Sequence, residues 1–124
     1  MKIHVATENT ATIGGYTKVP VVDETINFEG VSDNECEFIM ANQLLTEFRS
    51  ENIAGCLQLL TTKLRMGGTL VIGGIDLRSF CINTINNSIS GSSAAKTIGE
   101  CKSMSSSSDV INLLRQLGLN IATT

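Results

Sequence analysis

The hydrophobic pattern is clearest between Ser50 and Leu77, where a helical stripe leads into a short apolar strand. Apolar residues of this stripe recur at the spacing of an amphipathic helix, at Ile53, Leu57, Leu60 and Leu64. The sequence predicts that Ser50 caps this helix and that Gly67 and Gly68 end it. Thr69–Ile72 is apolar without alternation, which predicts a strand covered on both faces, as in a parallel α/β sheet.

Three shorter apolar segments precede this stretch and read as strands. They are Lys2–Ala6, Tyr16–Val22 and Cys36–Met40. Pro20 lacks a backbone N–H, which places the second strand at a sheet edge or ends it nearby. Leu44–Phe48 is predicted to form a helical turn that leads into the central helix.

The segment after the central strand is predicted to be mainly helical. Leu77, Phe80, Cys81 and Ile85 are helically spaced, whereas Asn87–Lys102 is rich in Ser and Gly and reads as a flexible loop or a weak helix. A last helix opens at Ser105–Ser108, stops at Gly118 and leads to an expected final strand, Leu119–Ala122. Its stripe is Val110, Leu113, Leu114 and Leu117. Helices alternating with short strands predict one α/β domain over residues 1–124, with a Rossmann-like, mostly parallel sheet and helices on its faces.

Composition narrows the function classes. The net charge of −3, the 4% aromatic content and the lack of Trp argue against a nucleic-acid-binding surface. No apolar run is long enough to span a membrane, and the N-terminal stretch does not read as a signal peptide, so we expect a soluble cytoplasmic protein. The four cysteines form no CxxC pair and there is a single histidine, His4, which favours free thiols over a metal site or disulfides. His4 reads as a structural residue of its strand rather than a catalytic base.

Four motifs of the chain resemble one family when they are taken in order. They are Lys2–Val5 with Gly15–Tyr16; Phe28 with Glu35–Phe48; Leu64–Ile72 with Asp76; and Leu113–Leu119. In this order the motifs are similar to those of small class I S-adenosylmethionine-dependent methyltransferases. The resemblance implies S-adenosylmethionine as the cofactor, bound beyond the carboxyl ends of the strands. The implied cofactor-binding residues are Ala6, Thr7, Glu8, Asn9, Asp23, Asn42, Gln43, Gly73 and Gly74.

The chain departs from the family pattern where the chemistry would lie. Ala6 and Glu8 stand where the family has glycines, so a side chain crowds the cofactor and a carboxylate repels its methionine end. Pro20 replaces the carboxylate that accepts from the ribose hydroxyls, unless Asp23 or Glu24 substitutes for it from a longer strand. Gln43 replaces a histidine and cannot act as a base. We therefore expect S-adenosylmethionine to bind weakly or not at all.

The sequence is compatible with two functions. The first is a non-catalytic binding or assembly module built on a methyltransferase-like scaffold; the alternative is an active methyltransferase with an unknown small-molecule or sugar substrate. Glu8 is either a functional acid or a solvated carboxylate of the loop. Gly73–Gly74 either line a ligand site or only turn the chain. Asp76 is either an acid that faces the substrate or the cap of the following helix. A homodimer is expected because the last strand would leave an open sheet edge.

Overall fold

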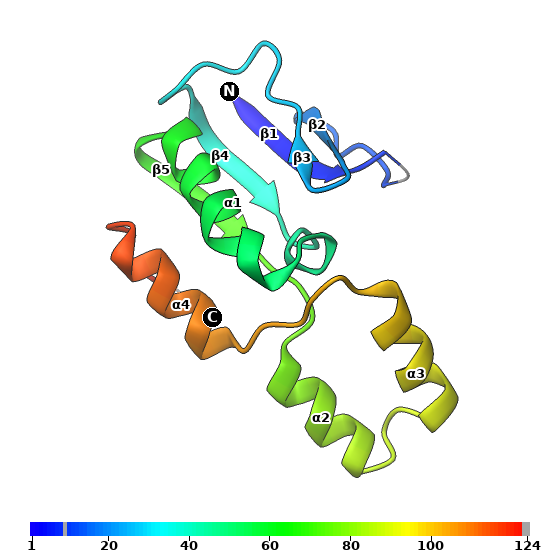
Figure 1. Cartoon of the computed structure of the whole chain (residues 1–124). Coiled ribbons are helices and arrows are strands. Elements are labelled where there is room, and N and C mark those ends of the chain that lie inside the picture. Colours follow the sequence, from blue (N-terminus) through cyan, green and yellow to red (C-terminus); the bar gives the residue numbers. More distant parts are fainter. Residues whose placement is uncertain (9, 123–124) are drawn as a thin grey trace.

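The computed structural model describes residues 1–8 and 10–122, which form a five-stranded, mostly parallel sheet and a set of helices (Figure 1). The strands are β1 (Lys2–Thr7), β2 (Thr17–Val22), β3 (Thr25–Ile26), β4 (Cys36–Ala41) and β5 (Leu64–Ile72). The helices are the 3₁₀ helix η1 (Leu45–Glu47) and the α-helices α1 (Ser50–Lys63), α2 (Leu77–Ile85), α3 (Gly91–Glu100) and α4 (Ser107–Gln116). The α/β class and the mostly parallel sheet agree with the sequence.

The strand order in the sheet is β3-β2-β1-β4-β5. β1 is parallel to both β2 and β4, and β4 is parallel to β5. Ile3 is level with Ile39, which is level with Leu70. The three predicted strands Lys2–Ala6, Cys36–Met40 and Thr69–Ile72 therefore fall in β1, β4 and β5, which lie side by side in parallel.

A tight hairpin joins β2 to the short antiparallel strand β3. Its two turn residues, Asp23 and Glu24, have φ angles of 49° and 61°. Left-handed backbone at both central positions is the conformation that two-residue hairpins favour. β3 occupies the sheet edge beside β2, so Pro20 lies in the strand next to the edge, where its carbonyl accepts from the N–H of Asn27 at 3.0 Å.

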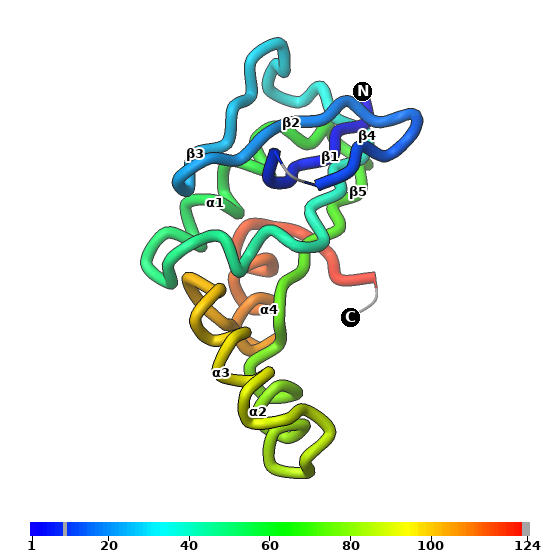
Figure 2. Tube along the Cα trace, turned by 90° about the vertical axis from the view of Figure 1, so that its right-hand side faces the viewer, coloured from blue at the N-terminus to red at the C-terminus, as the bar shows by residue number. Residues whose placement is uncertain are grey.

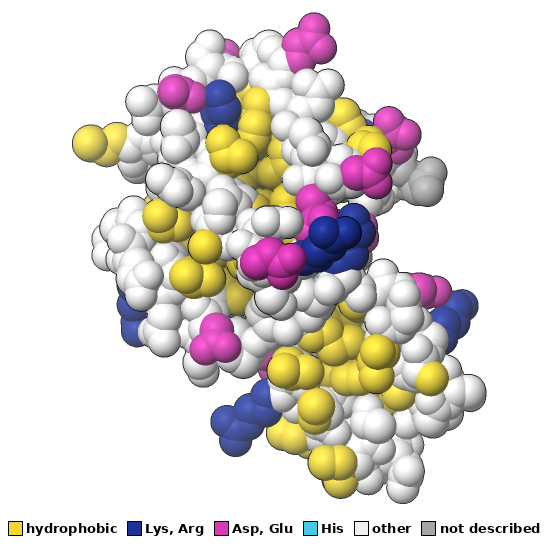
Figure 3. All heavy atoms as spheres, viewed as in Figure 1, with side chains coloured by type: hydrophobic (Ala, Val, Ile, Leu, Met, Phe, Trp, Pro, Cys, Tyr) yellow, Lys and Arg dark blue, Asp and Glu magenta, His cyan; other side chains and the backbone are white. Residues whose placement is uncertain are grey.

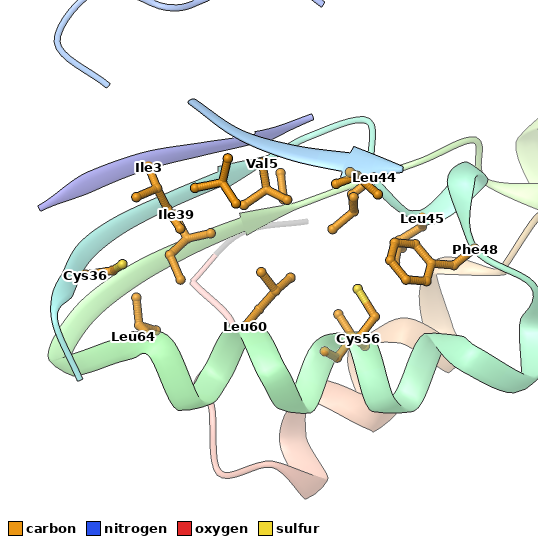
Figure 4. Packing of buried hydrophobic residues seen from close by; sticks show 14 of the residues in the cluster. Ile3, Val5, Cys36, Ile39, Leu44, Leu45, Phe48, Cys56, Leu60 and Leu64 are labelled. Atoms are coloured by element: carbon orange, nitrogen blue, oxygen red, sulfur yellow. The ribbon is translucent and has the colours of Figure 1, made fainter. Parts of the chain in front are cut away.

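The core lies between the sheet and α1, as Figure 4 shows. Ile3, Val5 and Ile39 point from the strands toward Cys56 and Leu60 of α1. All five side chains are 3% exposed or less. The α1 stripe predicted from the sequence is thus the main cover of the sheet.

Only one face of the sheet is covered by helix in the described part of the chain (Figure 2). The residues that alternate with the core positions, including His4, Phe38 and Met40, fall on the opposite face. The connections from β1 to β2 and from β3 to β4 contain no helix in their described residues. The expectation of helices on both faces is therefore not met.

The ends of α1 differ from the prediction. Ser50 makes no capping bond; instead the carboxylate of Glu24 accepts from the backbone N–H of Arg49 at 2.5 Å. α1 ends at Lys63 and β5 follows at once, so Gly67 and Gly68 lie inside the strand. The glycines form a bulge, because Cys36 pairs with Leu64 whereas Phe38 pairs with Thr69.

α2 and α3 form a helical pair that projects away from the sheet (Figures 1 and 2). α3 occupies most of the Ser- and Gly-rich segment, which resolves the earlier choice between loop and weak helix in favour of helix. Ser90 caps it by accepting from the N–H of Ser93 at 3.2 Å. Figure 3 shows hydrophobic side chains gathered over this pair, and its exposed large apolar residues are Leu77, Ile82, Ile85 and Ile98.

α4 packs against α1 through the predicted stripe, with Leu114 buried and Val110, Leu113 and Leu117 partly buried. Gly118 ends the helix with a φ of 86°, as expected. The predicted final strand Leu119–Ala122 is wrong: this segment pairs with no strand, and Leu119 and Ile121 pack against the core instead. The sheet edge on which the homodimer expectation was based is therefore absent.

Candidate functional site

A cleft of about 420 Å³ opens beyond the carboxyl ends of β1 and β4. The segment after β1, the segment running from β4 through η1, and the turn after β5 all contribute to its lining. The lining residues are Ala6, Thr7, Thr10, Asn42, Gln43, Leu44, Thr46, Glu47, Gly74 and Ile75. This is the edge of the sheet at which the sequence predicted a ligand site.

The structure brings five of the predicted site residues together in this cleft. They are Ala6, Thr7, Asn42, Gln43 and Gly74. Glu8, Asp23 and Gly73 are not part of the lining, and Asn9 lies outside the described residues. The predicted set is therefore divided between the cleft and its surroundings.

The glycine pair after β5 is required by close backbone packing. A Cβ on Gly73 would lie 2.6 Å from the carbonyl oxygen of Asn42, and one on Gly74 would lie 2.9 Å from the Cβ of Leu45. The N–H of Gly73 donates to Ala41 at 3.1 Å, and the carbonyl of Gly73 accepts from Leu45 at 3.1 Å. These contacts pack the β4–η1 segment against the end of β5; Gly74 also lines the cleft, whereas Gly73 does not.

Glu24 is engaged away from the cleft. Its carboxylate accepts from the side chain of Asn52 at 3.1 Å and lies 3.5 Å from Arg49 Nε and 4.0 Å from Lys102 Nζ. The backbone N–H of Arg49, followed by Asn52, lowers the pKa of this carboxyl. β2 extends past Pro20 to Val22, which is the condition under which Asp23 or Glu24 could take the place of the ribose-binding carboxylate. Glu24 is nevertheless bound at the start of α1, and Asp23 does not line the cleft.

Lys18 binds two backbone carbonyls beside the cleft. Its ammonium donates to the carbonyl of Glu8 at 2.9 Å and to the carbonyl of Thr10. The hydroxyl oxygens of Thr7 and Thr10 are 3.0 Å apart, so two of the three threonines that line the cleft hydrogen-bond to each other. The ammonium of Lys18 is thus bound to the backbone carbonyls of Glu8 and Thr10, and Lys18 does not line the cleft.

His4 is a buried strand residue, level with Lys18 on one side and Met40 on the other. The side chain is 3% exposed, and Nδ1 makes no hydrogen bond within the described residues. Burial, with a smaller contribution from the charge of Lys18, lowers the pKa of the imidazole. His4 does not line the cleft, which agrees with a structural position.

Asp76 proves to be a helix cap. Its carboxylate accepts from the N–H and the hydroxyl of Ser79 at 3.0 and 2.8 Å, at the start of α2. It also accepts from the N–H of Ser107 at 2.8 Å, at the start of α4. The bonds from Ser79 and then Ser107 lower the pKa of Asp76. One residue therefore joins two helix N-termini.

The cysteines are free thiols, as predicted. Cys36 and Cys56 are buried, Cys101 is half-buried and Cys81 is exposed. Burial raises the pKa of Cys56 to about 12. Among residues 1–8 and 10–122, no group of three or more His, Cys, Asp or Glu side chains is arranged to hold a metal ion.

Sequence reasoning missed five lining residues, namely Thr10, Leu44, Thr46, Glu47 and Ile75. The helical turn at Leu44–Phe48 was predicted, but the direction of its side chains depends on the contact with Gly73 and Gly74. A ligand-site search that included the turn after β4 would have found Thr46 and Glu47.

No helix in the described residues is long and apolar enough to cross a membrane. Comparison with protein-family models, curated proteins and solved structures finds no match to this chain.

Proposed function

We propose that the protein is a non-catalytic, methyltransferase-like binding module with a degenerate S-adenosylmethionine site. The observation that carries the proposal is the position of the cleft. The chain passes outward from β1 to β2 and β3 and then returns to β4 on the other side of β1, so the cleft lies where the strand order reverses. Ligands of open α/β sheets bind at this point.

The cleft suits a small polar ligand in size and lining. Its volume of about 420 Å³ falls within the range of small-molecule pockets, roughly 300–1,000 Å³. Threonine hydroxyls and the amides of Asn42 and Gln43 supply hydrogen-bonding groups, while Leu44 and Ile75 supply apolar surface. These groups favour binding of a small molecule that carries several hydrogen-bonding groups.

The same lining fits S-adenosylmethionine poorly. No carboxylate from the end of β2 enters the cleft, because Pro20 is level with Ala6, Asp23 lies outside the lining and Glu24 contacts Arg49. The two ribose hydroxyls would lack the carboxylate that accepts from them at the end of the second strand in the family, and a charged hydrogen bond is worth about 1.5–3 kcal/mol. Ala6 also adds a methyl group where the backbone would approach the cofactor. Glu8 lies outside the lining, so its carboxylate is not positioned to repel the methionine end of the cofactor.

The test is to restore the missing acceptor. Calorimetric titration with S-adenosylmethionine and S-adenosylhomocysteine compares the unmodified chain with the Ala6→Gly/Pro20→Asp double variant. We expect the double variant to bind about tenfold tighter or more. Ala6→Gly/Pro20→Asn is the matched control, since it has nearly the same shape without the charge. A folded double variant that binds no better than this control would contradict the proposal.

An active methyltransferase is the second candidate. It is favoured by the position of a polar cleft at the reversal of the strand order, and by the fact that methyl transfer depends mainly on proximity and orientation. The lack of a base at Gln43 does not exclude it for acceptors that need no deprotonation. A methyl acceptor and turnover by the unmodified chain would establish this alternative.

A further inference from the structure

Glu47 is the only ionisable side chain among the described residues that line the cleft. It is the last residue of η1, and its backbone N–H bond to Leu44, at 3.0 Å, fixes it in the turn after β4. The residue is half-buried. Among the described residues its carboxylate makes no hydrogen bond and no ion pair, whereas partly desolvated carboxylates are normally compensated by a partner.

The cations around the cleft are already bound to other groups. Lys102 lies beside the cleft, because its backbone N–H donates to Thr46 at 2.9 Å, but its ammonium lies 4.0 Å from the Glu24 carboxylate. Lys18 donates to the carbonyls of Glu8 and Thr10. The carboxylate of Glu47 therefore sets the sign of charge inside the cleft.

The charge of the surrounding chain acts in the same direction. Residues 1–76, which form the sheet and most of the cleft, contain ten acidic and five basic residues. An excess of one sign around a cleft raises the local concentration of ligands with the opposite charge and disfavours those with the same charge. Phosphorylated and carboxylated ligands are negatively charged, so the excess of acidic residues would disfavour their binding in this cleft.

We propose that the cleft selects a small hydroxylated organic cation, with the Glu47 carboxylate as counter-ion for its ammonium group. The hydroxyls of Thr7, Thr10 and Thr46 and the amides of Asn42 and Gln43 complement ligand hydroxyl groups. The inference rests on the proposed binding function of the same cleft and assigns its ligand class.

The experiment titrates the full chain with three probes of one shape and different charge: D-glucosamine, D-glucose and D-glucuronate. Binding is followed by chemical-shift changes of backbone amides at constant ionic strength. We expect glucosamine to bind about tenfold tighter than glucose, with shifts at Thr7, Asn42 and Glu47, because its ammonium gains a charge-assisted hydrogen bond. Glucuronate should bind more weakly than glucose.

The charge change is tested with Glu47→Gln and with the matched control Glu51→Gln. Glu51 lies in the first turn of α1 outside the cleft lining, so its loss changes the net charge equally. Glu47→Gln should reduce the glucosamine-to-glucose affinity ratio to about one, whereas Glu51→Gln should leave it unchanged. Equal binding of the two sugars, equal effects of the two variants, or no binding by any probe would overturn the inference. Methyl transfer by the unmodified chain would refute the proposed non-catalytic function but leave the Glu47 selectivity standing.

Discussion

The sheet with α1 and the α2–α3 pair are both made of short elements, yet only the first region has a continuous core. The buried cluster joins β1, β2, β4, β5, η1, α1 and α4 and contains no residue of α2 or α3. In the helical pair only Phe80 and Ala94 are buried. Helices of nine and ten residues are too short to be stable alone in water. The pair therefore depends on its caps and on the small contact that buries Phe80 and Ala94, and we expect it to open locally at lower free energy than the sheet.

The largest difference between the regions is expected from deleting core volume. Leu60→Ala removes a fully buried side chain between α1 and the sheet and should lower the free energy of unfolding by about 2–5 kcal/mol. Ile85→Ala in α2 removes a side chain that is 77% exposed and should change the free energy of unfolding by about 0.5 kcal/mol or less. Urea denaturation measures both. Equal losses would contradict the contrast between the two regions.

The next largest effect on stability is expected where Gly73 packs against Asn42 beside the cleft. Gly73→Ala places a methyl group against the Asn42 carbonyl and should destabilise the fold by about 1–3 kcal/mol. Gly55→Ala is the control, because a Cβ there meets no atom within 4 Å and the residue lies within α1. It should stabilise the protein by about 0.5–1 kcal/mol. A Gly73→Ala variant as stable as the unmodified chain would show that the packing is not tight there.

Asp76 links the helical pair to α4, so its loss should act on both. In Asp76→Asn we expect faster amide exchange in the first turns of α2 and α4, whereas Asp109→Asn, in the first turn of α4, should affect α4 alone. Because folding lowers the pKa of Asp76 below its ordinary 3.8, its contribution is complete above that pH and is lost as the pH falls through the lower folded value. The two variants should therefore exchange alike in strong acid. A difference that persists there would contradict this role.

The smallest expected effect is a difference in thiol reactivity between the α2–α3 pair and the core of the sheet and α1. With an aromatic disulfide reagent at pH 8, Cys81 of α2 should react first because it is exposed, and Cys101 more slowly because burial raises its pKa. Cys56 should react only after unfolding, since it is buried and its pKa is about 12. Mass spectrometry of labelled peptides gives the order. Labelling of Cys56 as early as Cys81 in the folded protein would contradict the structure.

The sheet and α1 could be predicted from sequence because apolar periodicity reports directly on burial. The α1 stripe and the parallel neighbours β1, β4 and β5 follow from it. The bulge at Gly67 could not be predicted, because a glycine pair after a helical stripe looks the same whether it ends the helix or bends a strand. The prediction of a strand at Leu119–Ala122 was wrong for a similar reason. Leu119 and Ile121 alternate with polar or small residues as in a strand, but they pack against the core without a neighbouring strand.

The candidate site could be predicted in part. Ala6, Thr7, Asn42, Gln43 and Gly74 follow from the rule that ligands bind at strand carboxyl ends. The position of Glu47 could not be derived, because it depends on the fold of η1 against the turn after β5. The engagement of Glu24 with Arg49 and Lys102 likewise joins residues that are far apart in the sequence.

The central claim is that the cleft does not support methyl transfer, and equilibrium binding of S-adenosylmethionine to the unmodified chain tests it most directly. A methyl-labelled cofactor allows binding and transfer to be followed in the same sample, with a mixture of small-molecule and sugar acceptors present. The proposed loss of the ribose acceptor predicts no saturable binding at micromolar cofactor and no transfer of label. Micromolar binding accompanied by methyl transfer to any acceptor would contradict the account.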